Sequence, residues 1–363
     1  MQGIILKNTS RISRGMNSNV SSFYKIIGLL KATPVIGARF IHPDAVKPAI
    51  PRKKVTTQTI LSKYRKGEKI ACCTGYDYPA GVLLDAAGFD MILVGDSSGM
   101  GYENTLPVTM EDMIHNCKSV TRGAHASLVV GDMPFGSYEV SKEDGLRNAL
   151  RFMKEGFVDA IKLEGGKKRA ETVRHIVDAG IAVQGHIGLT PQSISNLGGF
   201  RVQGKTFDNA MKVIEDAIAL ENAGCFSVVI ECVPPLVGKA ITKSIHIPTI
   251  GIGSGPYVSG QILVYHDILG MLQHPHHAQA TPSFCKQYAQ IGLEVHKALC
   301  TFKDEIVSKQ FPGNNYCSYK IPDEAVAKLE TALGMKLMDD DESVTPAPVS
   351  TTNADKDEPI KVY

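Results

Sequence analysis

Residues 91–100 read MILVGDSSGM, an apolar run that stops at Gly95 and continues with Asp96 and two serines. Two interpretations of this stretch compete. It is either the loop around a nucleophilic serine or the end of a buried strand that delivers a carboxylate to a site. The serine interpretation fails because Gly95–Gly99, although it matches Gly-x-Ser-x-Gly in its letters, is not followed directly by an expected helix and so lacks the strand–turn–helix context of that motif. The fold therefore depends on whether other apolar runs end in the same way.

Short runs rich in Val, Ile and Leu recur from residue 70 onward, between longer stretches with helical apolar spacing. We expect strands at Ile70–Asp77, Asp90–Asp96, Ser127–Asp132, Ala160–Glu164, Ile181–His186, Phe226–Glu231, Ile247–Gly251 and Gln261–Asp267. We expect helices at Tyr78–Ala87, Met110–Thr121, Lys142–Glu155, Lys168–Ala179 and Phe207–Asn222. Strands that alternate with helices predict an α/β fold with a parallel sheet. Eight such units over about 200 residues predict a (β/α)8 TIM barrel, and a doubly wound open sheet is the alternative.

Seven of the eight expected strands end in a carboxylate or a histidine: Asp77, Asp96, Asp132, Glu164, His186, Glu231 and Asp267. In a barrel the carboxyl ends of all strands open onto one face, where active sites are built. Strand caps placed by chance explain one or two such residues but not a series. We therefore interpret Asp96 as a site carboxylate.

Three of these acids, Asp96, Asp132 and Glu164, end consecutive strands and should be neighbours around the mouth of the barrel. Carboxylates this close repel one another unless one is protonated or a cation lies between them. A hard divalent cation such as Mg²⁺ takes oxygen ligands and leaves positions for water or substrate. The sequence thus predicts a Mg²⁺ site, although Mn²⁺ or Co²⁺ would also accept such ligands. The alternative is that these acids cap helices or pair with Lys or Arg.

Four further residues are candidates for the chemistry at this face. Lys162 precedes Glu164 by two residues and faces the same way, so it either holds a substrate oxygen or forms a simple ion pair. Ser97 adds a hydroxyl and a backbone N–H. His186 either orients a neighbour or is a hydrogen-bonded core residue. Glu231 lies outside the metal cluster and is the candidate general base.

The chain has 363 residues, of which 21% are charged, and a net charge of +2, so neither nucleic acid nor a membrane is predicted as a partner. The charge is unevenly distributed. Residues 1–54 carry ten Lys or Arg and one acid, which leaves a net charge of −7 for the remainder. A basic head rich in Ser and Asn is typical of a mitochondrial transit peptide, and a disordered basic arm is the alternative. We expect a mitochondrial (matrix) protein, and the eight cysteines without a C-x-x-C pair suit that reducing compartment.

Three regions are predicted on this basis. Residues 1–51 form the targeting head, residues 52–313 the barrel, and residues 314–363 a C-terminal extension. Within the extension, Asp323–Leu333 is expected to form a helix, and a disordered acidic tail follows it.

Two other motifs are weaker signals. The run Gly251–Pro256 after the seventh strand is either an anion loop or a tight turn that needs positive φ. The run His274–His277 is expected to be a surface loop.

Seven motifs in order resemble one family: Gly95–Met100, Leu106–Thr109, Asp132–Phe135, Lys162–Gly166, Gly185–Gln192, Glu231–Pro234 and Ile250–Gly253. Together they resemble the 3-methyl-2-oxobutanoate hydroxymethyltransferases, also called ketopantoate hydroxymethyltransferases, from about Val55 to Gly313. Two departures are a long loop after His266-Asp267 and Pro282-Ser283-Phe284 where many members have Pro-Lys-Phe.

The resemblance implies a barrel of the phosphoenolpyruvate/pyruvate type. It also implies transfer of the methylene group of 5,10-methylenetetrahydrofolate to 3-methyl-2-oxobutanoate, a step of pantothenate biosynthesis, through a Mg²⁺-stabilised enolate. The implied residues are Asp96, Asp132 and Glu164 for the metal, Asp96, Ser97, Asp132 and Lys162 for the keto acid, and Glu231 as proton acceptor. A homo-oligomer, a decamer in bacterial members, is implied as well.

Two competing interpretations remain at this point. One is a Mg²⁺-dependent 2-oxo-acid lyase or mutase of the same barrel type that uses no folate. The other is a non-enzymatic barrel kept for binding or assembly, in which the charges are structural.

Overall fold

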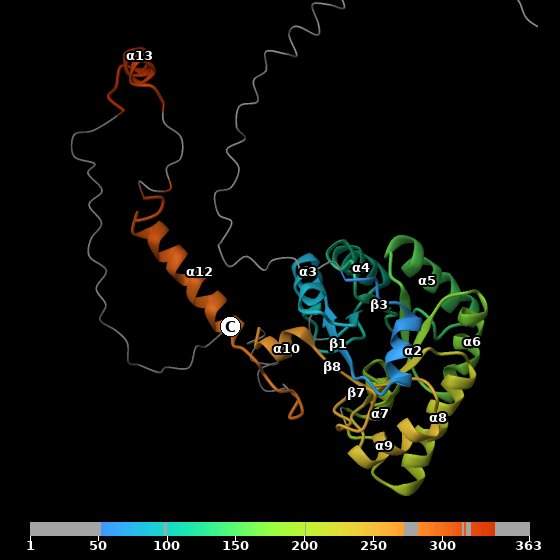
Figure 1. Ribbon diagram of the computed structural model, residues 1–363. Coiled ribbons are helices and arrows are strands. Elements are labelled where there is room, and N and C mark those ends of the chain that lie inside the picture. Colours follow the sequence, from blue (N-terminus) through green and yellow to red (C-terminus); the bar gives the residue numbers. More distant parts are fainter. Residues whose placement is uncertain are drawn as a thin grey trace, which may run out of the picture. The chain divides into compact units, whose positions relative to one another are not determined.

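Eight parallel strands close into a barrel in the computed structural model, which describes residues 52–97, 100–199, 201–271, 282–313, 316 and 321–337 (Figure 1). The strands are β1 (Ile70–Gly75), β2 (Met91–Val94), β3 (Leu128–Asp132), β4 (Ala160–Glu164), β5 (Val183–Gly188), β6 (Ser227–Glu231), β7 (Thr249–Ile252) and β8 (Gly260–Leu263). Each strand pairs with the next, and β8 pairs with β1. The predicted (β/α)8 barrel is confirmed, and the open sheet is wrong.

Helices follow strands β1 to β6: α3 (Tyr78–Ala87), α4 (Met110–Gly123), α5 (Lys142–Glu155), α6 (Ala170–Asp178), α8 (Phe207–Asn222) and α9 (Pro235–Ser244). The predicted bounds of α3, α5 and α8 are those observed. The predicted helix at Lys168–Ala179 is divided into a short 3₁₀ turn, η2 (Lys167–Arg169), and α6. The sequence did not predict α2 (Thr57–Arg65), α7 (Ile194–Leu197), α9 or α12 (Ile291–Val307), whereas α13 (Asp323–Leu333) is confirmed.

The sequence predicted that Asp77 ends the first strand and belongs to the series of strand-end acids, but it has a different role. It is the N-cap of α3, and its Oδ1 accepts a hydrogen bond from the backbone N–H of Ala80 at 2.8 Å. An Asp just before an apolar helix commonly satisfies one of the free N–H groups of the first turn. Strand β1 therefore ends at Gly75, two residues earlier than expected.

The eighth strand is also shorter than expected. It ends at Leu263, and Tyr265–Leu269 forms the short helix α10. The ladder stops here because the backbone N–H of Tyr265 donates to Thr74 Oγ1 at 2.9 Å, and the N–H of Asp267 donates to the carbonyl of Val264 at 3.1 Å. Asp267 is thus a helical residue.

Two apolar layers surround the strands. The inner layer fills the barrel with alternate strand residues, among them Leu128, Val130, Val229 and Ile250. The outer layer lies between the strands and the helices. Ile60 of α2 is fully buried and packs with the inner layer, so the amino-terminal end of the barrel is closed and only the carboxyl end can hold a site.

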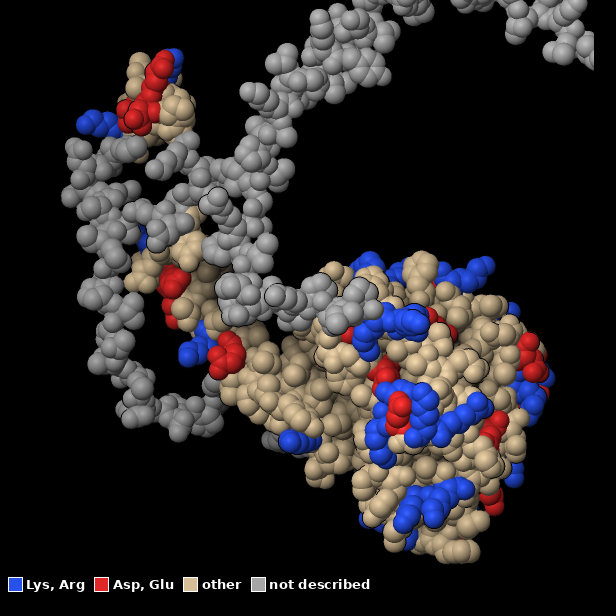
Figure 2. All heavy atoms as spheres, viewed as in Figure 1, with Lys and Arg blue, Asp and Glu red and all other residues tan. Residues whose placement is uncertain are grey.

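Ion pairs hold the segment before β1 against this closed end. They join Arg52 to Asp85 at 3.4 Å, Lys54 to Asp159 at 2.6 Å and Lys63 to Asp90 at 2.7 Å. Figure 2 shows basic side chains gathered near α2 with acidic side chains between them. The face in that view is of mixed sign.

The glycine-rich run after β7 is a turn in which Gly253 and Gly255 have φ of 63° and 80°. The positive-φ interpretation of Gly251–Pro256 is thus confirmed, and an anion there stays a prediction. The predicted head at residues 1–51, the run His274–His277 and the acidic tail from residue 338 lie outside the described residues. Among the residues that are described, no helix is long and apolar enough to cross a membrane.

Candidate active site

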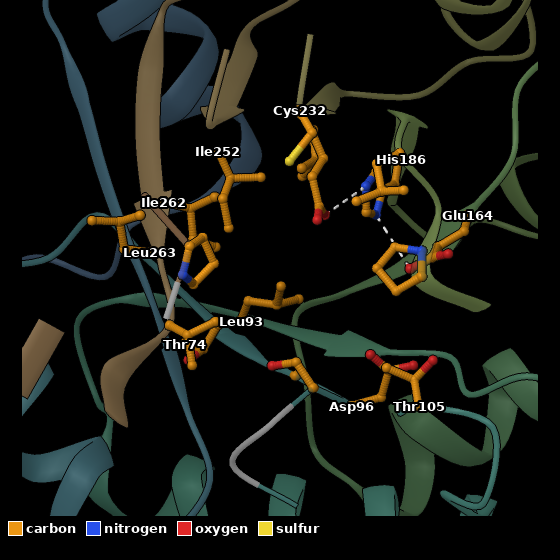
Figure 3. A pocket seen from close by; sticks show the side chains of 18 of the residues that line it. Thr74, Leu93, Asp96, Thr105, Glu164, His186, Cys232, Ile252, Ile262 and Leu263 are labelled. Atoms are coloured by element: carbon orange, nitrogen blue, oxygen red, sulfur yellow. Dashed lines mark ion pairs between the residues drawn. The ribbon is translucent and has the colours of Figure 1, made fainter. Parts of the chain in front are cut away.

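A cavity of about 800 Å³ opens at the carboxyl ends of the strands (Figure 3). All seven residues predicted for the site line it: Asp96, Ser97, Asp132, Lys162, Glu164, His186 and Glu231. Figure 3 shows Asp96, Glu164 and His186 pointing into the space, with Ile252 and Ile262 on the opposite wall. The sequence therefore predicted which residues meet here.

The strand register explains why these side chains meet. Side chains alternate across a strand, so every second residue faces the interior of the barrel. Asp132 is paired with Lys162 across β3 and β4, and Glu164 is paired with His186 across β4 and β5. Glu231 ends β6 on the same interior face. Neighbouring strands thus place five polar side chains on one rim.

The deepest part of the site is a buried cluster of three acids around one ammonium group. The exposed fractions are 4% for Asp96, 2% for Asp132, 3% for Lys162 and 4% for Glu164. Lys162 Nζ lies 2.8 Å from Asp132 Oδ1 and 3.8 Å from Glu164 Oε1. The backbone N–H of Asp96 donates to Asp132 Oδ2 at 3.4 Å.

Burial and mutual repulsion govern the charges in this cluster. Burial raises the pKa of both Asp132 and Glu164 well above the ordinary carboxyl range, and Lys162 only partly opposes it. Burial alone would lower the pKa of Lys162, but the carboxylates of Asp132, Glu164 and Asp96 raise it, so the amine stays charged. Lys162 does form an ion pair with Asp132, as one of the alternatives predicted, and Glu164 and Asp96 are further acids close to the same ammonium group.

The oxygen ligands that this cluster offers suit a divalent cation. If all three acids are ionised, they exceed the one ammonium group by two negative charges. The raised pKa values of Asp132 and Glu164 favour the protonated forms when no cation is bound, and a divalent cation would let these acids ionise by balancing the excess charge. Asp132 Oδ1 is buried and accepts no hydrogen bond of good geometry, although Lys162 lies nearby. Among the described residues, no group of three or more His, Cys, Asp or Glu side chains is arranged to hold a metal ion by itself, so water or substrate oxygens would have to complete a site here. An open oxygen site completed by water or substrate is the kind that suits Mg²⁺.

His186 connects the acid cluster to Glu231. Its Nδ1 lies 3.3 Å from Lys162 Nζ and 3.4 Å from Glu164 Oε1, and its Nε2 lies 3.2 Å from Glu231 Oε2. Burial, together with Lys162, lowers the pKa of His186 below its ordinary value, so the ring is neutral near pH 7. If Nδ1 accepts from the ammonium group of Lys162, which can only donate, the ring proton is on Nε2, on the side of Glu231, although Nε2 and Glu231 do not have hydrogen-bond geometry.

Ser97 is held by an aromatic neighbour. Its Oγ lies 2.7 Å from the hydroxyl of the buried Tyr76, and either oxygen can donate. Burial raises the pKa of Tyr76, even though its contact with Ser97 opposes this, so Tyr76 stays a phenol. Ser97 thus has a fixed position beside Asp96.

Several residues of the site were not predicted. Gln192 and Tyr138 are each 2% exposed and lie against the acid cluster, where Gln192 hydrogen-bonds Asp96 and Tyr138 hydrogen-bonds Glu164. Arg201, Val202, Tyr102 and Phe284 line the outer part of the cavity. No strand-end rule could have found them, because they come from the connections between strands and helices.

The sequence matches the family model for ketopantoate hydroxymethyltransferase over residues 54–314. A 3-methyl-2-oxobutanoate hydroxymethyltransferase 1, mitochondrial, of Oryza sativa subsp. japonica is 52% identical over 309 residues, 84% of this chain and 84% of that one. The protein of the same name from Arabidopsis thaliana is 55% identical over 76% of this chain and 80% of its own length. A 3-methyl-2-oxobutanoate hydroxymethyltransferase of Heliobacterium modesticaldum is 52% identical over 75% of this chain and 98% of its own length.

Among solved structures, 2,3-dimethylmalate lyase, described as a member of the PEP mutase/isocitrate lyase superfamily, matches with a TM-score of 0.45. It is 12% identical over 77% of this chain and 99% of that chain, values that carry no argument beyond the barrel already described. The family match covers the whole barrel, and the relatives cover three quarters of the chain or more. This chain belongs to the ketopantoate hydroxymethyltransferase family.

Proposed function

We propose that this protein transfers the methylene group of 5,10-methylenetetrahydrofolate to 3-methyl-2-oxobutanoate and releases 2-dehydropantoate, a step of pantothenate biosynthesis. The observation that carries the proposal is a buried cluster of three acids around one ammonium group, next to the His186–Glu231 pair. The names of the relatives supply the acceptor substrate. They are named for hydroxymethyl transfer, which favours this activity over the lyase or mutase.

Asp96, Asp132 and Glu164 would hold Mg²⁺ at the bottom of the cavity. Lewis-acid polarisation of the keto oxygen, worth several kcal/mol at the transition state, is the chemistry that Mg²⁺ supplies when bound. Lys162 is charged and lies among these acids, so it would hold an oxygen of the keto acid and the negative charge that develops on it. Ser97 would donate a further hydrogen bond to the keto acid.

Glu231 would remove the proton from C3 of the keto acid. Its side chain is 15% exposed, whereas that of Glu164 is 3% exposed, so substrate can reach it. His186 Nε2 lies 3.2 Å from Glu231 Oε2 without hydrogen-bond geometry, and a small rotation would let it donate to the Glu231 carboxylate and orient it. The resulting enolate carbon then forms a bond to the methylene carbon, and a water molecule supplies the oxygen of the new hydroxyl group. Both carbon–nitrogen bonds of the methylene group break, and tetrahydrofolate leaves with two protons on its nitrogens, one from C3 through Glu231 and one from the water.

The cavity has room for both substrates. Its volume of about 800 Å³ is in the range that takes a drug-sized ligand, far more than a small keto acid fills. Its lining also includes the exposed side chains of Tyr102, Val202 and Phe284, together with the cation of Arg201 and the acid of Glu103. An apolar wall with a cation at its edge suits a folate, which has flat rings and a glutamate carboxylate.

The activity is tested with the full-length chain, 3-methyl-2-oxobutanoate, Mg²⁺ and 5,10-methylenetetrahydrofolate labelled in the methylene carbon. Label in 2-dehydropantoate, lost with a chelator and restored by Mg²⁺, is the expected result. A labelled folate pool that stays unchanged, while the keto acid is cleaved or rearranged, would instead identify a lyase or mutase.

Two further properties belong to the proposal. The plant relatives are named mitochondrial, and the basic composition of residues 1–51 agrees with import into the matrix. A homo-oligomer, a decamer by the resemblance, is expected, and light scattering of the purified protein measures its mass.

A further inference from the structure

A buried pair of polar residues supports the acid cluster from behind. Gln192 lies in the 3₁₀ turn η3 (Pro191–Ser193) after β5, and Tyr138 lies in the connection between β3 and α5. Each is 2% exposed. A buried glutamine amide lowers the stability of the fold unless its two N–H groups and its oxygen are all hydrogen-bonded. The groups that Gln192 and Tyr138 bind therefore indicate what these residues do.

The side-chain amide of Gln192 uses both of its protons. Nε2 donates to Asp96 Oδ2 at 2.8 Å and to the carbonyl of Met133 at 2.9 Å. Rotating the amide by half a turn would place Oε1 against a carboxylate and a carbonyl, so only one orientation is favourable. The backbone N–H of Gln192 also donates to Glu164 Oε2 at 3.0 Å. One residue therefore holds an oxygen of two different acids.

Tyr138 is the partner of the remaining polar atom of the Gln192 side chain, the amide oxygen Oε1. Its hydroxyl donates to Gln192 Oε1 and accepts from the backbone N–H of Glu164 at 3.1 Å. Glu164, Tyr138 and Gln192 thus form a closed ring of hydrogen bonds, and Gln192 connects this ring to Asp96 just after β2. Each member depends on the orientation of the next.

We propose that Gln192, oriented by Tyr138, is a positioning residue that holds Asp96 and Glu164 at the spacing at which they bind the divalent cation. Neutral N–H donors can hold two repelling carboxylates in place without cancelling the negative charge that a cation needs. Lys162 lowers that charge, whereas Gln192 does not. The inference rests on the proposed metal site, and it adds residues that are not themselves metal ligands.

The test compares Mn²⁺ affinity with stability in the full-length chain. Gln192→Leu removes the donors, and Tyr138→Phe removes only the hydroxyl that orients the amide. Gln184→Leu is the matched control, because Gln184 is also 2% exposed but donates to Ser227 Oγ at 2.9 Å rather than to an acid. Mn²⁺ binding is measured by electron paramagnetic resonance without substrate, and Tm is measured without metal.

We expect Gln192→Leu to weaken Mn²⁺ binding about 10- to 100-fold, as is usual when a partner of a metal ligand is removed, with Gln184→Leu unchanged. Tyr138→Phe should weaken it several-fold and decides the question if Gln192→Leu does not fold. Wild-type affinity in both variants, with a lowered Tm alone, would overturn the inference and leave the metal site standing. Failure of the wild-type protein to bind Mn²⁺ or Mg²⁺ would instead contradict the metal part of the proposed function and this inference with it.

Discussion

Six carboxylate residues line the cavity, and exposure separates the four that were predicted for the site into two roles. The side chains of Asp132 and Glu164 are 3% exposed and lie around the Lys162 ammonium group. The side chain of Glu231 is 15% exposed and has only His186 as an ionic partner among the described residues. The deep acids suit a cation that must be shielded from water, and Glu231 suits a group that must meet the substrate and then return its proton.

Arg201 is the residue whose substitution should separate the two substrates. We expect Arg201→Gln to raise the KM for 5,10-methylenetetrahydrofolate about 10- to 100-fold, the usual cost of losing a charged hydrogen bond. Proton exchange at C3 of the keto acid should stay at the wild-type rate, because Arg201 lines the outer cavity and not the acid cluster. Steady-state kinetics and the exchange rate are the two measurements.

Lys205→Gln is the matched control, since Lys205 is an exposed base four residues away that does not line the cavity. An unchanged folate KM in Arg201→Gln would remove Arg201 from the folate site. A loss of exchange in the same variant would mean that this residue acts on the keto acid.

At the residue scale the sequence predicted the centre of the site but not its support. Asp132, Lys162, Glu164, His186 and Glu231 could be predicted because side-chain alternation places them on one interior face. The roles of Gln192 and Tyr138 depend on hydrogen bonds between segments 54 residues apart, which no local pattern encodes.

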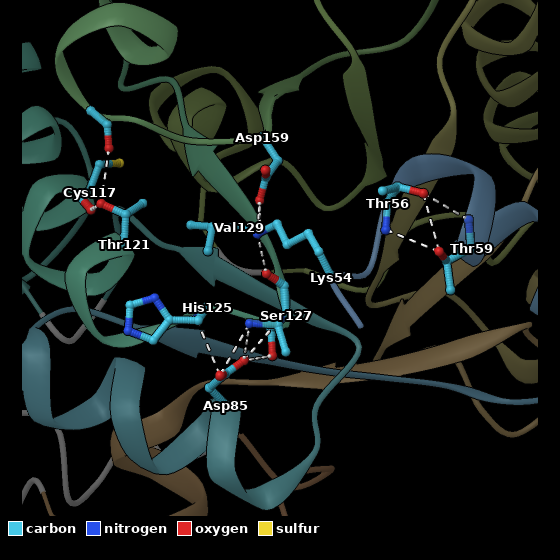
Figure 4. Close-up of polar contacts among 12 residues, drawn as sticks. Lys54, Thr56, Thr59, Asp85, Cys117, Thr121, His125, Ser127, Val129 and Asp159 are labelled. Carbon is cyan, nitrogen blue, oxygen red and sulfur yellow. Dashed lines mark hydrogen bonds and ion pairs between the residues drawn. The ribbon is translucent and has the colours of Figure 1, made fainter. Parts of the chain in front are cut away.

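At the scale of a single element, Asp85 near the end of α3 opposes the helix dipole, which disfavours an acid in the last turn. The structure compensates with hydrogen bonds from the segment before β3 (Figure 4). Asp85 accepts from the backbone N–H of His125 at 3.2 Å and of Ser127 at 2.7 Å, and from Ser127 Oγ at 2.9 Å. This acid therefore fixes the entry of the chain into β3.

Asp85→Asn should lower the free energy of unfolding by about 1–3 kcal/mol near pH 7, because an amide cannot accept all of these bonds. The pKa of Asp85 is lowered: burial would raise it, but the hydrogen bonds from Ser127, His125 and Ala126 prevail. A lowered folded-state pKa gives stability that is present above the unfolded pKa and is lost as pH falls through the folded one. Denaturant titrations at pH 7 and in acid should show the difference shrinking below the ordinary carboxyl range.

Asp178 provides the comparison, since it is an exposed acid at the last residue of α6. Asp178→Asn should leave stability unchanged or slightly raised, because only the unfavourable dipole interaction is lost. Equal effects of the two substitutions at every pH would contradict the account of Asp85.

Elements were predictable where caps and apolar spacing agree, as for α3, α5 and α8. They were not predictable where tertiary contacts decide. The apolar run Gln261–Asp267 reads as one strand, but Thr74 takes the N–H of Tyr265 and the chain turns into α10. Likewise, α2 is short and polar, with Ile60 as its one buried residue, so its role in closing the barrel has no clear pattern in the sequence.

At the scale of the whole molecule, the two ends of the barrel differ in what they do. The amino-terminal end is closed by α2 and ion pairs, and the carboxyl end carries the cavity. Stability and chemistry are thus placed at opposite ends of one fold, as is general for TIM barrels.

Residues 1–51 are predicted to act separately from the barrel. Fused to a fluorescent protein, this segment should direct it to mitochondria, because a basic, acid-poor head is what the import machinery recognises. Replacing Arg11, Arg14 and Lys25 with Gln should abolish import, and replacing Ser21 and Ser22 with Ala should not. Cytosolic fluorescence of the unmodified fusion would refute the targeting prediction without affecting the enzyme.

The central claim is that Glu231 removes the C3 proton of 3-methyl-2-oxobutanoate beside a metal-binding acid cluster. Loss of the C3 proton signal in D₂O, followed by NMR with the full-length chain and Mg²⁺, with and without tetrahydrofolate, measures this step alone. Glu215→Gln, an exposed acid on α8, is the control. We predict Mg²⁺-dependent exchange in the wild type and in Glu215→Gln, and a loss of about 10²- to 10⁴-fold in Glu231→Gln. Exchange at the wild-type rate in Glu231→Gln would show that another group is the base and would contradict the account.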